Sequence, residues 1–412
     1  MKAKKISLFG VFGQGNLGNE STLQAILYNI REYLPSADVN CICPGPKDTS
    51  ATYNISAFPI SVQGGKKSNF HRLVGRENWV AKLVRRIFIR IPMEMVEWVK
   101  AFNTLKGTNM LIVAGGGQVA NLGCTALGWP YQIFKWSTIT KLCRCKQLFV
   151  SVGAGPIDTP LSRWFLKFGL SLADYRSYRD SFSKEYLKST GFERNSDRIY
   201  PDLAFSLPKA IMPDCSNRNS QPPVIGVGLI GYYGRCGEEE QGAAIYREFM
   251  NKICSFVTWL IQHEYTVRLL IGDVPYDNPV KHDLIELINV RGVKYKKDQL
   301  LNEPISSVEQ LLVQLATIDV LVSPRFHNLL LALMLNKPVI SISYSEKNDW
   351  LMAGMGLAEY CQDIGRLDVG KLIKQLIKIE KDAENLRPHI KQKTEEFRRA
   401  LDEQYTMIFS NV

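Results

Sequence analysis

Residues 319–350 read DVLVSPRFHNLLLALMLNKPVISISYSEKNDW, and this stretch decides the fold of the chain. Two short apolar runs, residues 320–322 and 339–342, have the length and composition of buried strands. An apolar segment with helical character, residues 329–335, lies between them. The order strand, loop, helix, strand predicts one βαβ unit whose polar residues gather in its loops. A polar turn is expected after the second strand.

Three polar side chains of this unit come just after the predicted strands. Arg325 and His327 follow the first strand, and Lys347 follows the second, in the turn that also carries Tyr344 and Glu346. Ligands of open parallel sheets bind at the carboxyl ends of the strands. We therefore predict that Arg325, His327 and Lys347 line one crevice and form an anion site there.

The composition of the chain indicates a basic globular protein. A length of 412 residues favours two domains over one. An apolar content of 45% with 22% charged residues is typical of a globular fold. The net charge of +11 favours an anionic partner such as a phosphate, a nucleic acid or an acidic lipid headgroup. Charge alone does not choose among these partners, and a generally basic surface is the simpler interpretation.

The cysteines and the N-terminus indicate a reduced, cytoplasmic protein. The nine cysteines are scattered, and neither close pair, at residues 41–43 and 143–145, has zinc-finger or thioredoxin spacing. We therefore expect reduced thiols and no metal site. The N-terminal apolar run is short and broken by glycines, which predicts a first strand and not a signal peptide. No apolar run reaches the roughly 18 residues of a membrane-spanning helix.

A glycine-rich turn follows the first predicted strand. That strand covers residues 6–12, the turn GQGNLGNE covers residues 13–20, and a helix is expected at residues 21–34. A glycine turn at a helix N-terminus exposes backbone N–H groups that can hold an anion or approach a sugar closely. The residues predicted to bind substrate from this turn are Gly15, Asn16, Gly18 and Glu20.

The same turn has the formal pattern of a dinucleotide-binding loop. Gly13, Gly15 and Gly18 make G-x-G-x-x-G between a strand and a helix. That function needs an acidic residue at the end of the second strand to hold the ribose, and the strand predicted at residues 39–43 has none there. We therefore expect no nicotinamide or flavin cofactor.

Glycines also follow the next two predicted strands. Residues 115–117 are a glycine triplet after the strand at 110–114, and Gly153 follows the strand at 147–152. Each alone is consistent with an ordinary tight turn. Together with the first turn they predict a glycine-lined cleft, with Gly116, Gly117 and Gly153 at the substrate.

Arg179 stands just before a helix expected at residues 182–189. From this position its guanidinium could reach the predicted cleft and bind substrate. The alternative is an ion pair with Asp180 or a similar acid, and the sequence leaves both open.

Residues 66–90 form a basic and aromatic segment. Eight Lys or Arg accompany a single acid, Glu77. The pattern is typical of an amphipathic helix on an anionic membrane surface, and equally of a solvated basic helix packed on its domain. No recognised nucleic-acid module appears, so we expect no nucleic-acid partner.

The remaining sequence suggests where the domains divide. Residues 209–223 are polar and rich in proline and asparagine, as expected of a linker. We predict an N-terminal domain at residues 1–208, a C-terminal domain at residues 224–368 in which strands and helices again alternate, and C-terminal helices at residues 369–412.

The ordered motifs of the chain resemble those of the polysaccharide pyruvyl transferase family. They are GNLGNE at 15–20, GGG at 115–117, SVGAGP at 151–156, YRDS at 178–181, PD at 201–202 and SPRFH at 323–327. The resemblance implies a glycosyltransferase-B-like α/β fold, with two Rossmann-like domains facing across a cleft and C-terminal helices packing back. It also implies transfer of a pyruvyl group from phosphoenolpyruvate to a sugar as a ketal, without a metal, in polysaccharide or exopolysaccharide biosynthesis.

The chain departs from the family pattern at two positions. Asn19 stands where the glycine turn usually carries Asp, and Asn121 lies where an acid often follows the glycine triplet. These differences concern the acceptor side and leave room for a diverged acceptor.

The resemblance also implies roles for the basic residues. Arg179 and Arg325 are similar to the family's donor-binding arginines, because guanidinium forks bind carboxylate and phosphate oxygens in pairs. Lys347 is expected to add a third positive charge. His327 is expected to supply a proton or to manage the departing phosphate, since imidazole titrates near neutral pH.

Two other functions fit the same observations. A glycosyltransferase of this architecture would bind a nucleotide sugar, with Glu346 as a candidate ribose ligand. A non-catalytic basic protein would bind a membrane or nucleic acid through charge alone.

Under the pyruvyl transferase hypothesis the acceptor is a sugar or a lipid-linked oligosaccharide. A lipid-linked acceptor would explain residues 66–90 as a peripheral contact with the cytoplasmic face of the membrane.

Overall fold

The computed structural model describes most of the chain: residues 4–61, 91–121, 123–214, 222–234 and 239–410. The basic segment at residues 66–90, predicted to contact a membrane or to pack as a solvated helix, lies outside the described residues. So do residues 215–221 of the predicted linker. Within the described ranges, no helix is both long and apolar enough to cross a membrane.

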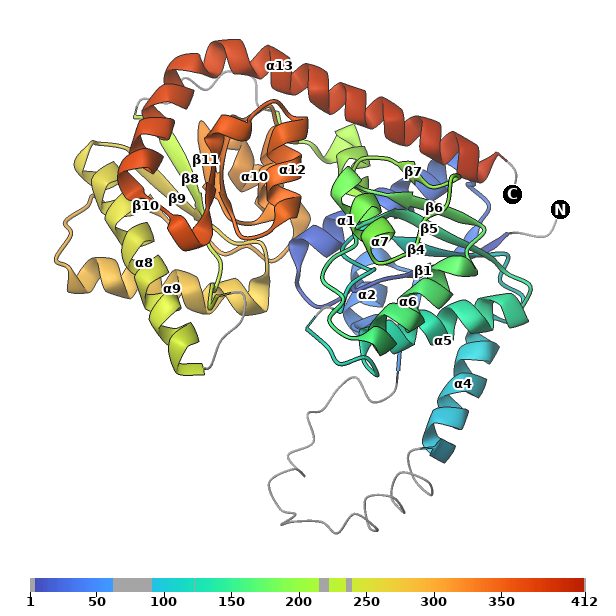
Figure 1. The fold of residues 1–412 in the computed structure, drawn as a ribbon. Helices are drawn as coiled ribbons and strands as arrows, with labels where there is room; N and C mark the ends of the chain where they lie inside the picture. The colour runs from blue at the N-terminus through green and yellow to red at the C-terminus, as the bar shows by residue number, and fades with distance from the viewer. Residues whose placement is uncertain (1–3, 62–90, 122, 215–221, 235–238, 411–412) are drawn as a thin grey trace, which may run out of the picture. The chain divides into compact units, whose positions relative to one another are not determined.

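The first half of the chain forms a parallel sheet of seven strands in the order β3-β2-β1-β4-β5-β6-β7. Its strands are β1 (Lys5–Phe9), β2 (Asp38–Cys43), β3 (Ser56–Pro59), β4 (Met110–Ala114), β5 (Lys146–Val152), β6 (Tyr175–Tyr178) and β7 (Arg198–Ile199). Figure 1 shows helices on both sides of this sheet. They are α1 (Leu17–Tyr33), α2 (Pro46–Tyr53), α4 (Ile91–Leu105), α5 (Trp129–Leu142), α6 (Pro160–Ser171) and α7 (Ser181–Ser189). Because both faces are covered, the central strand β4 is apolar and buried throughout.

The second half forms a parallel sheet of six strands in the order β10-β9-β8-β11-β12-β13. Its strands are β8 (Val224–Gly228), β9 (Thr266–Leu270), β10 (Leu300–Leu301), β11 (Val320–Ser323), β12 (Val339–Ser343) and β13 (Cys361–Asp363). The helices between them are α8 (Glu239–Gln262), α9 (Val274–Val290), α10 (Val308–Ala316), α11 (Phe326–Met334) and α12 (Glu346–Gly354). The strand order reverses between β8 and β11, which is where open sheets of this kind bind ligands.

The βαβ unit predicted from residues 319–350 is confirmed as β11, α11 and β12, with β11 and β12 paired in parallel. The polar turn expected after β12 is wrong in one respect, because Glu346 and Lys347 begin helix α12. The first turn of α12 consists of polar residues, so its sequence has the pattern of a turn and not of an apolar helix face. Its apolar contribution, Leu351 and Met352, comes later and is buried.

The helical C-terminus is confirmed, but it is one helix, α13 (Val369–Phe409), which continues through Pro388. Asp368 caps its N-terminus by accepting a hydrogen bond from the backbone N–H of Lys371. Near its other end the hydroxyls of Tyr405 and Ser206 lie 2.9 Å apart, and the ring of Phe397 packs edge-on against Phe205 at 5.0 Å. The helix is thereby fixed to the short 3-10 helix η3 (Leu203–Ser206).

The chain divides into two compact units that do not follow one cut in the sequence. The first unit contains Met1–Gln14 and Ile30–Asp202, and the second contains Gly15–Asn29 and Leu203–Val412. Helix α1 therefore begins in the second unit and ends in the first. As a consequence, Gly15, Asn16, Gly18 and Glu20 belong to the same unit as residues 319–350.

Candidate functional site

Helix α1 begins four residues earlier than the sequence predicts. Its first residue is Leu17, so Gly18 and Glu20 lie in its first turn and not in a preceding loop. The reason is local: the side-chain oxygen of Asn16 accepts a hydrogen bond from the backbone N–H of Asn19 at 3.1 Å. An Asn at this position caps the helix and lets it start directly after the glycines.

The segment around Asn16 is held against the loop that follows β9. The Asn16 amide donates to the carboxylate of Asp273 at 2.8 Å. Two backbone hydrogen bonds, both 2.9 Å long, join Leu17 N–H to the Gly272 carbonyl and Val274 N–H to the Gly15 carbonyl. The predicted substrate-binding turn is thus part of the strand-end region of the second sheet.

Gly18 and His327 are in direct contact. A Cβ atom placed on Gly18 would lie 2.0 Å from Nδ1 of His327, which no packing arrangement tolerates. His327 lies in the first turn of α11, half-buried, and its ring meets that of Phe326 edge to face at 5.1 Å. Only glycine at position 18 leaves room for the imidazole in this position.

Arg325 is anchored by a buried acid. One terminal nitrogen of its guanidinium donates to Asp277 Oδ1. The other carboxylate oxygen of Asp277 accepts the backbone N–H groups of Gly272 and Asp273, each at 2.9 Å. Burial raises the pKa of Asp277, and the neighbouring Arg325 opposes that rise. Asp277 therefore fixes the direction of the arginine.

Substituting Asp277 tests this anchoring. Asp277→Asn keeps an acceptor for the backbone N–H groups but removes the charge that holds Arg325. We expect a roughly tenfold weaker affinity for an anionic ligand of Arg325, because a charge-assisted hydrogen bond is worth about 1.5–3 kcal/mol. Calorimetric titration of the wild type and the variant measures this, with Asp283→Asn on the exposed side of α9 as the control. Equal affinities would contradict a positioning role for Asp277.

Lys347 lies near the same group of residues. Its ammonium nitrogen is 4.7 Å from the ring centroid of Tyr344 and 5.9 Å from that of Phe326. Phe326 thus contacts both His327 and Lys347, and it directly follows Arg325 in the chain. The three side chains predicted to share a crevice come from the carboxyl ends of neighbouring strands, and two of them, His327 and Lys347, contact the ring of Phe326. A shared crevice stays a prediction.

The electrostatics of this region favour an anion. Arg325 is paired through one terminal nitrogen, and its buried Nε has no hydrogen-bond partner among the described residues. The ammonium group of Lys347 lies over two aromatic rings. The N-terminus of α11 has no side-chain cap at Arg325, so its backbone N–H groups add to the positive potential. A carboxylate or phosphate is the ligand class that suits this set.

The glycines predicted in the first unit also meet at strand ends. The Gly153 N–H donates to the Gly116 carbonyl at 2.6 Å, between the ends of β5 and β4. A Cβ atom on Gly153 would lie 2.7 Å from Nε of Arg179, so glycine is needed here for close approach. Gly117 follows Gly116 directly. Gly153 therefore packs against Arg179 and is joined to Gly116 by a backbone hydrogen bond.

Arg179 follows a strand that the sequence did not predict, β6, and so stands at a carboxyl end like the other predicted residues. Its guanidinium lies 3.3 Å from Asp180 and 3.4 Å from Asp202, and its side chain is nearly buried. The ion pair that the sequence left open as the alternative is thus present. A role for Arg179 in binding substrate stays a prediction.

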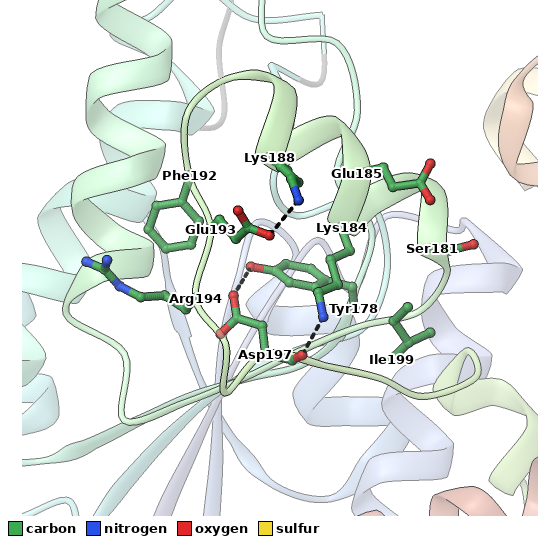
Figure 2. A pocket seen from close by; sticks show the side chains of 10 residues that line it. All are labelled: Tyr178, Ser181, Lys184, Glu185, Lys188, Phe192, Glu193, Arg194, Asp197 and Ile199. Atoms are coloured by element: carbon green, nitrogen blue, oxygen red, sulfur yellow. Dashed lines mark hydrogen bonds and ion pairs between the residues drawn. The ribbon is translucent and has the colours of Figure 1, made fainter.

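A cavity of about 210 Å³ lies elsewhere in the first unit, beside α7 and the end of β6 (Figure 2). The Tyr178 hydroxyl donates to Asp197 at 2.9 Å, and Lys188 pairs with Glu193 at 2.9 Å. Burial and the charge of Asp197 raise the pKa of Tyr178, which keeps it a neutral donor. Lys184 also donates to the Asp197 carbonyl at 2.9 Å, and none of the predicted site residues lines the cavity.

Sequence reasoning missed the residues that support the predicted ones. Asp277, Asp273 and Phe326 are given no role by the sequence analysis. The available signal is that Gly272-Asp273 follows the largely apolar run at residues 266–271, just as Ser323-Pro324 follows the run at 320–322. Two such ends at the reversal of strand order are expected to meet.

Comparison with known sequences gives two findings. The family model described as Polysaccharide pyruvyl transferase matches residues 16–346. The amylovoran biosynthesis protein AmsJ of Erwinia amylovora is 22% identical over 400 residues, covering 90% of this chain and 91% of that protein.

Solved structures share the fold at low identity. A putative UDP-N-acetylglucosamine 2-epimerase from Listeria monocytogenes is 11% identical with a TM-score of 0.60, covering 99% of this chain and 96% of its own. MurG from Acinetobacter baumannii is 10% identical with a TM-score of 0.55, covering 98% and 99%. A glycosyltransferase from Rickettsia africae is 11% identical with a TM-score of 0.57, covering all of both chains. These likenesses confirm the α/β, glycosyltransferase-B-like fold class and concern the fold alone.

Proposed function

Because this chain belongs to the polysaccharide pyruvyl transferase family, we propose that it transfers the pyruvyl group of phosphoenolpyruvate to a sugar of a polysaccharide or of its precursor. The product is a cyclic ketal, and phosphate is released. The name of the relative AmsJ, an amylovoran biosynthesis protein, supports the proposal that the sugar carrying the pyruvyl group is part of a polysaccharide.

The observation that carries the proposal is the arrangement of cationic and proton-carrying groups at the β11 end. Arg325 is directed by Asp277, Lys347 lies beside Phe326, and His327 packs against Gly18. Phosphoenolpyruvate has two anionic groups, a carboxylate and a phosphate. An arginine fork can bind two oxygens of either group, and the lysine supplies a point charge for the other.

The proposed reaction starts with protonation of the methylene carbon of phosphoenolpyruvate. Positive character then develops on the adjacent carbon that carries the phosphate, and a sugar hydroxyl attacks there and gives up its proton. The bond from this carbon to the phosphate oxygen breaks, its electron pair leaves with phosphate, and a neighbouring hydroxyl closes the ketal. One hydroxyl proton balances the proton that formed the methyl group, and the other leaves with phosphate.

His327 is the group proposed to handle these protons. It adjoins Arg325 through Phe326, and its ring is held from two sides, by Phe326 and by the backbone of Gly18. A general acid must be held in a fixed position relative to the atom it protonates. The packing of His327 meets that requirement better than an exposed histidine would.

The test of the proposal is phosphate release from phosphoenolpyruvate across a panel of glycans and lipid-linked oligosaccharides. Thermal-shift measurements with phosphoenolpyruvate and with nucleotide sugars accompany it. We expect stabilisation by phosphoenolpyruvate and release of phosphate that depends on an acceptor. Stabilisation by a nucleotide sugar alone would overturn the proposal in favour of glycosyl transfer.

Arg325→Lys probes the donor site without leaving Asp277 unpaired. Lysine keeps the positive charge beside Asp277 but cannot form a two-point contact with a carboxylate or phosphate. The KM for phosphoenolpyruvate is expected to rise on the order of 10- to 100-fold, with a smaller change in kcat. Steady-state kinetics measure the split, and Arg291→Lys on the exposed end of α9 is the matched control. An unchanged KM would remove Arg325 from the donor site.

A further inference from the structure

The side of helix α4 that faces α5 carries a charged residue, Glu94, beside the buried Ala101 and Leu105. The side chains that face α5 include Glu94, whose carboxylate accepts hydrogen bonds from buried Lys135 at 3.1 Å and from Tyr131 at 3.0 Å. Trp98 also turns inward and donates to the Tyr131 hydroxyl at 2.9 Å. In an ordinary helix the charged residues face water and the apolar stripe faces the core.

The outward side of α4 is apolar. Ile91, Met95, Val99 and Phe102 follow one another at intervals of four, four and three residues, the spacing of one helix face. Met95 is 65% exposed and Val99 is 60% exposed. Figure 1 shows α4 extending away from the sheet, next to α5. A helix that presents such a stripe outward is suited to an apolar medium or partner.

Aromatic contacts connect α4 to α6 across α5. The ring of Phe134 in α5 lies 6.3 Å from Trp98 and 5.3 Å from Trp164 of α6. Trp164 is 52% exposed. We call the outward residues Ile91, Met95, Val99, Phe102 and Trp164 the α4–α6 face.

Charge decides among the surfaces that could cover this face. Residues 66–90, which lead directly into α4, carry eight Lys or Arg and one acid in the sequence. Arg163 and Lys167 flank Trp164 on α6. Tryptophan with neighbouring basic residues is typical of contact with lipid headgroups. A second copy of the chain would carry the same net charge of +11, so pairing two copies has an electrostatic cost.

We propose that the α4–α6 face docks on a membrane surface rich in anionic lipid, with its apolar side chains entering the headgroup region. The face lies outside the site described above. The proposal goes beyond the proposed function and does not depend on it. It requires only that apolar area and positive charge act together, because one amphipathic helix binds weakly without electrostatic attraction.

Flotation with vesicles tests the docking. The full chain is mixed with vesicles of phosphatidylcholine, with and without phosphatidylglycerol, and the bound fraction is measured. We expect binding only to the anionic vesicles. The double variant Met95→Asp/Val99→Asp is expected to lower that binding about tenfold or more, since it removes two apolar side chains that would enter the headgroup region and adds two negative charges.

The matched control is Val313→Asp, at a valine that is 56% exposed on α10. It adds a charge at a similarly exposed helical position and is expected to float like the wild type. Circular dichroism checks that all variants fold. Equal flotation of the wild type and the double variant would overturn the proposal, and so would a wild type that does not float.

Light scattering measures the molar mass in solution and tests whether the α4–α6 face is a self-association surface instead of a lipid-binding one. If the double variant turns a larger assembly into a monomer while the wild type ignores vesicles, the face is a self-association surface and the lipid proposal is wrong. Phosphate release with a water-soluble acceptor is measured in parallel. Flotation without phosphate release would leave the docking proposal standing and count against the proposed function alone.

Discussion

A His327→Ala variant is expected to lose turnover by a factor of about 100 to 10⁴, while its affinity for phosphoenolpyruvate stays nearly unchanged. General acid–base catalysis by one positioned side chain contributes a factor of this size. The donor is held by the proposed contacts with Arg325 and Lys347, and neither contact passes through the imidazole. The loss should therefore appear in kcat and not in KM.

The measurement is steady-state phosphate release together with calorimetric binding of phosphoenolpyruvate. His263→Ala is the control, because His263 lies at the end of α8, stacked on Trp259 at 4.0 Å and away from the site residues. His327→Gln adds a second comparison, since glutamine keeps hydrogen-bonding groups but does not titrate. Normal turnover in His327→Ala would show that another group moves the proton.

Local pattern was enough to predict strands β11 and β12 of the second sheet and the polar residues that follow them. Residues 320–322 and 339–342 are continuous apolar runs bounded by turn residues, and burial on both faces of a parallel sheet requires such runs. Arg325 and His327 follow the first run directly, so their place at a strand end could be predicted with it. The same logic located the glycines after β4 and β5.

The contacts that assemble the site could not be predicted in this way. Asp277 lies 48 residues before Arg325, and Gly18 comes from the start of the chain. Hydrophobic periodicity describes an element and its faces, but it carries no information about which distant loops meet. The partners became visible only when the strand order showed where the sheet reverses.

Strand β6 was missed for a related reason. Its sequence, YRSY, is short and contains a charged residue, which argues against a buried strand. Arg176 is nevertheless buried, because its guanidinium donates to Asp197 at 2.8 Å and to the carbonyls of Leu170 and Ala173. A paired charge can occupy a position that an isolated one cannot.

The second large effect is expected from Gly18→Ala, a change of one methyl group. That methyl would lie 2.0 Å from Nδ1, 2.4 Å from Cγ and 2.7 Å from Cε1 of His327. Three atoms of a rigid ring are involved, so the imidazole must move as a whole by on the order of 1 Å. A misplacement of that size can cost about 100-fold in rate, and we expect at least this loss of kcat.

The thermal stability of Gly18→Ala distinguishes a displaced His327 from a destabilised fold. Alanine is favoured over glycine in a helix by about 1 kcal/mol, so α1 itself should tolerate Gly18→Ala. The control is Gly354→Ala in α12, where the nearest atom, Cζ of Phe397, is 3.7 Å from the added methyl. That variant should keep full turnover, as measured by phosphate release.

A double-mutant cycle completes the argument. If the methyl group acts by moving the imidazole, it has nothing left to move once His327 is alanine. Gly18→Ala/His327→Ala should then be no slower than His327→Ala alone, because changes at residues in contact are not additive. Additive losses in kcat would mean that Gly18 contributes through its own backbone, for example by admitting the sugar acceptor, and that its contact with His327 does not govern the reaction.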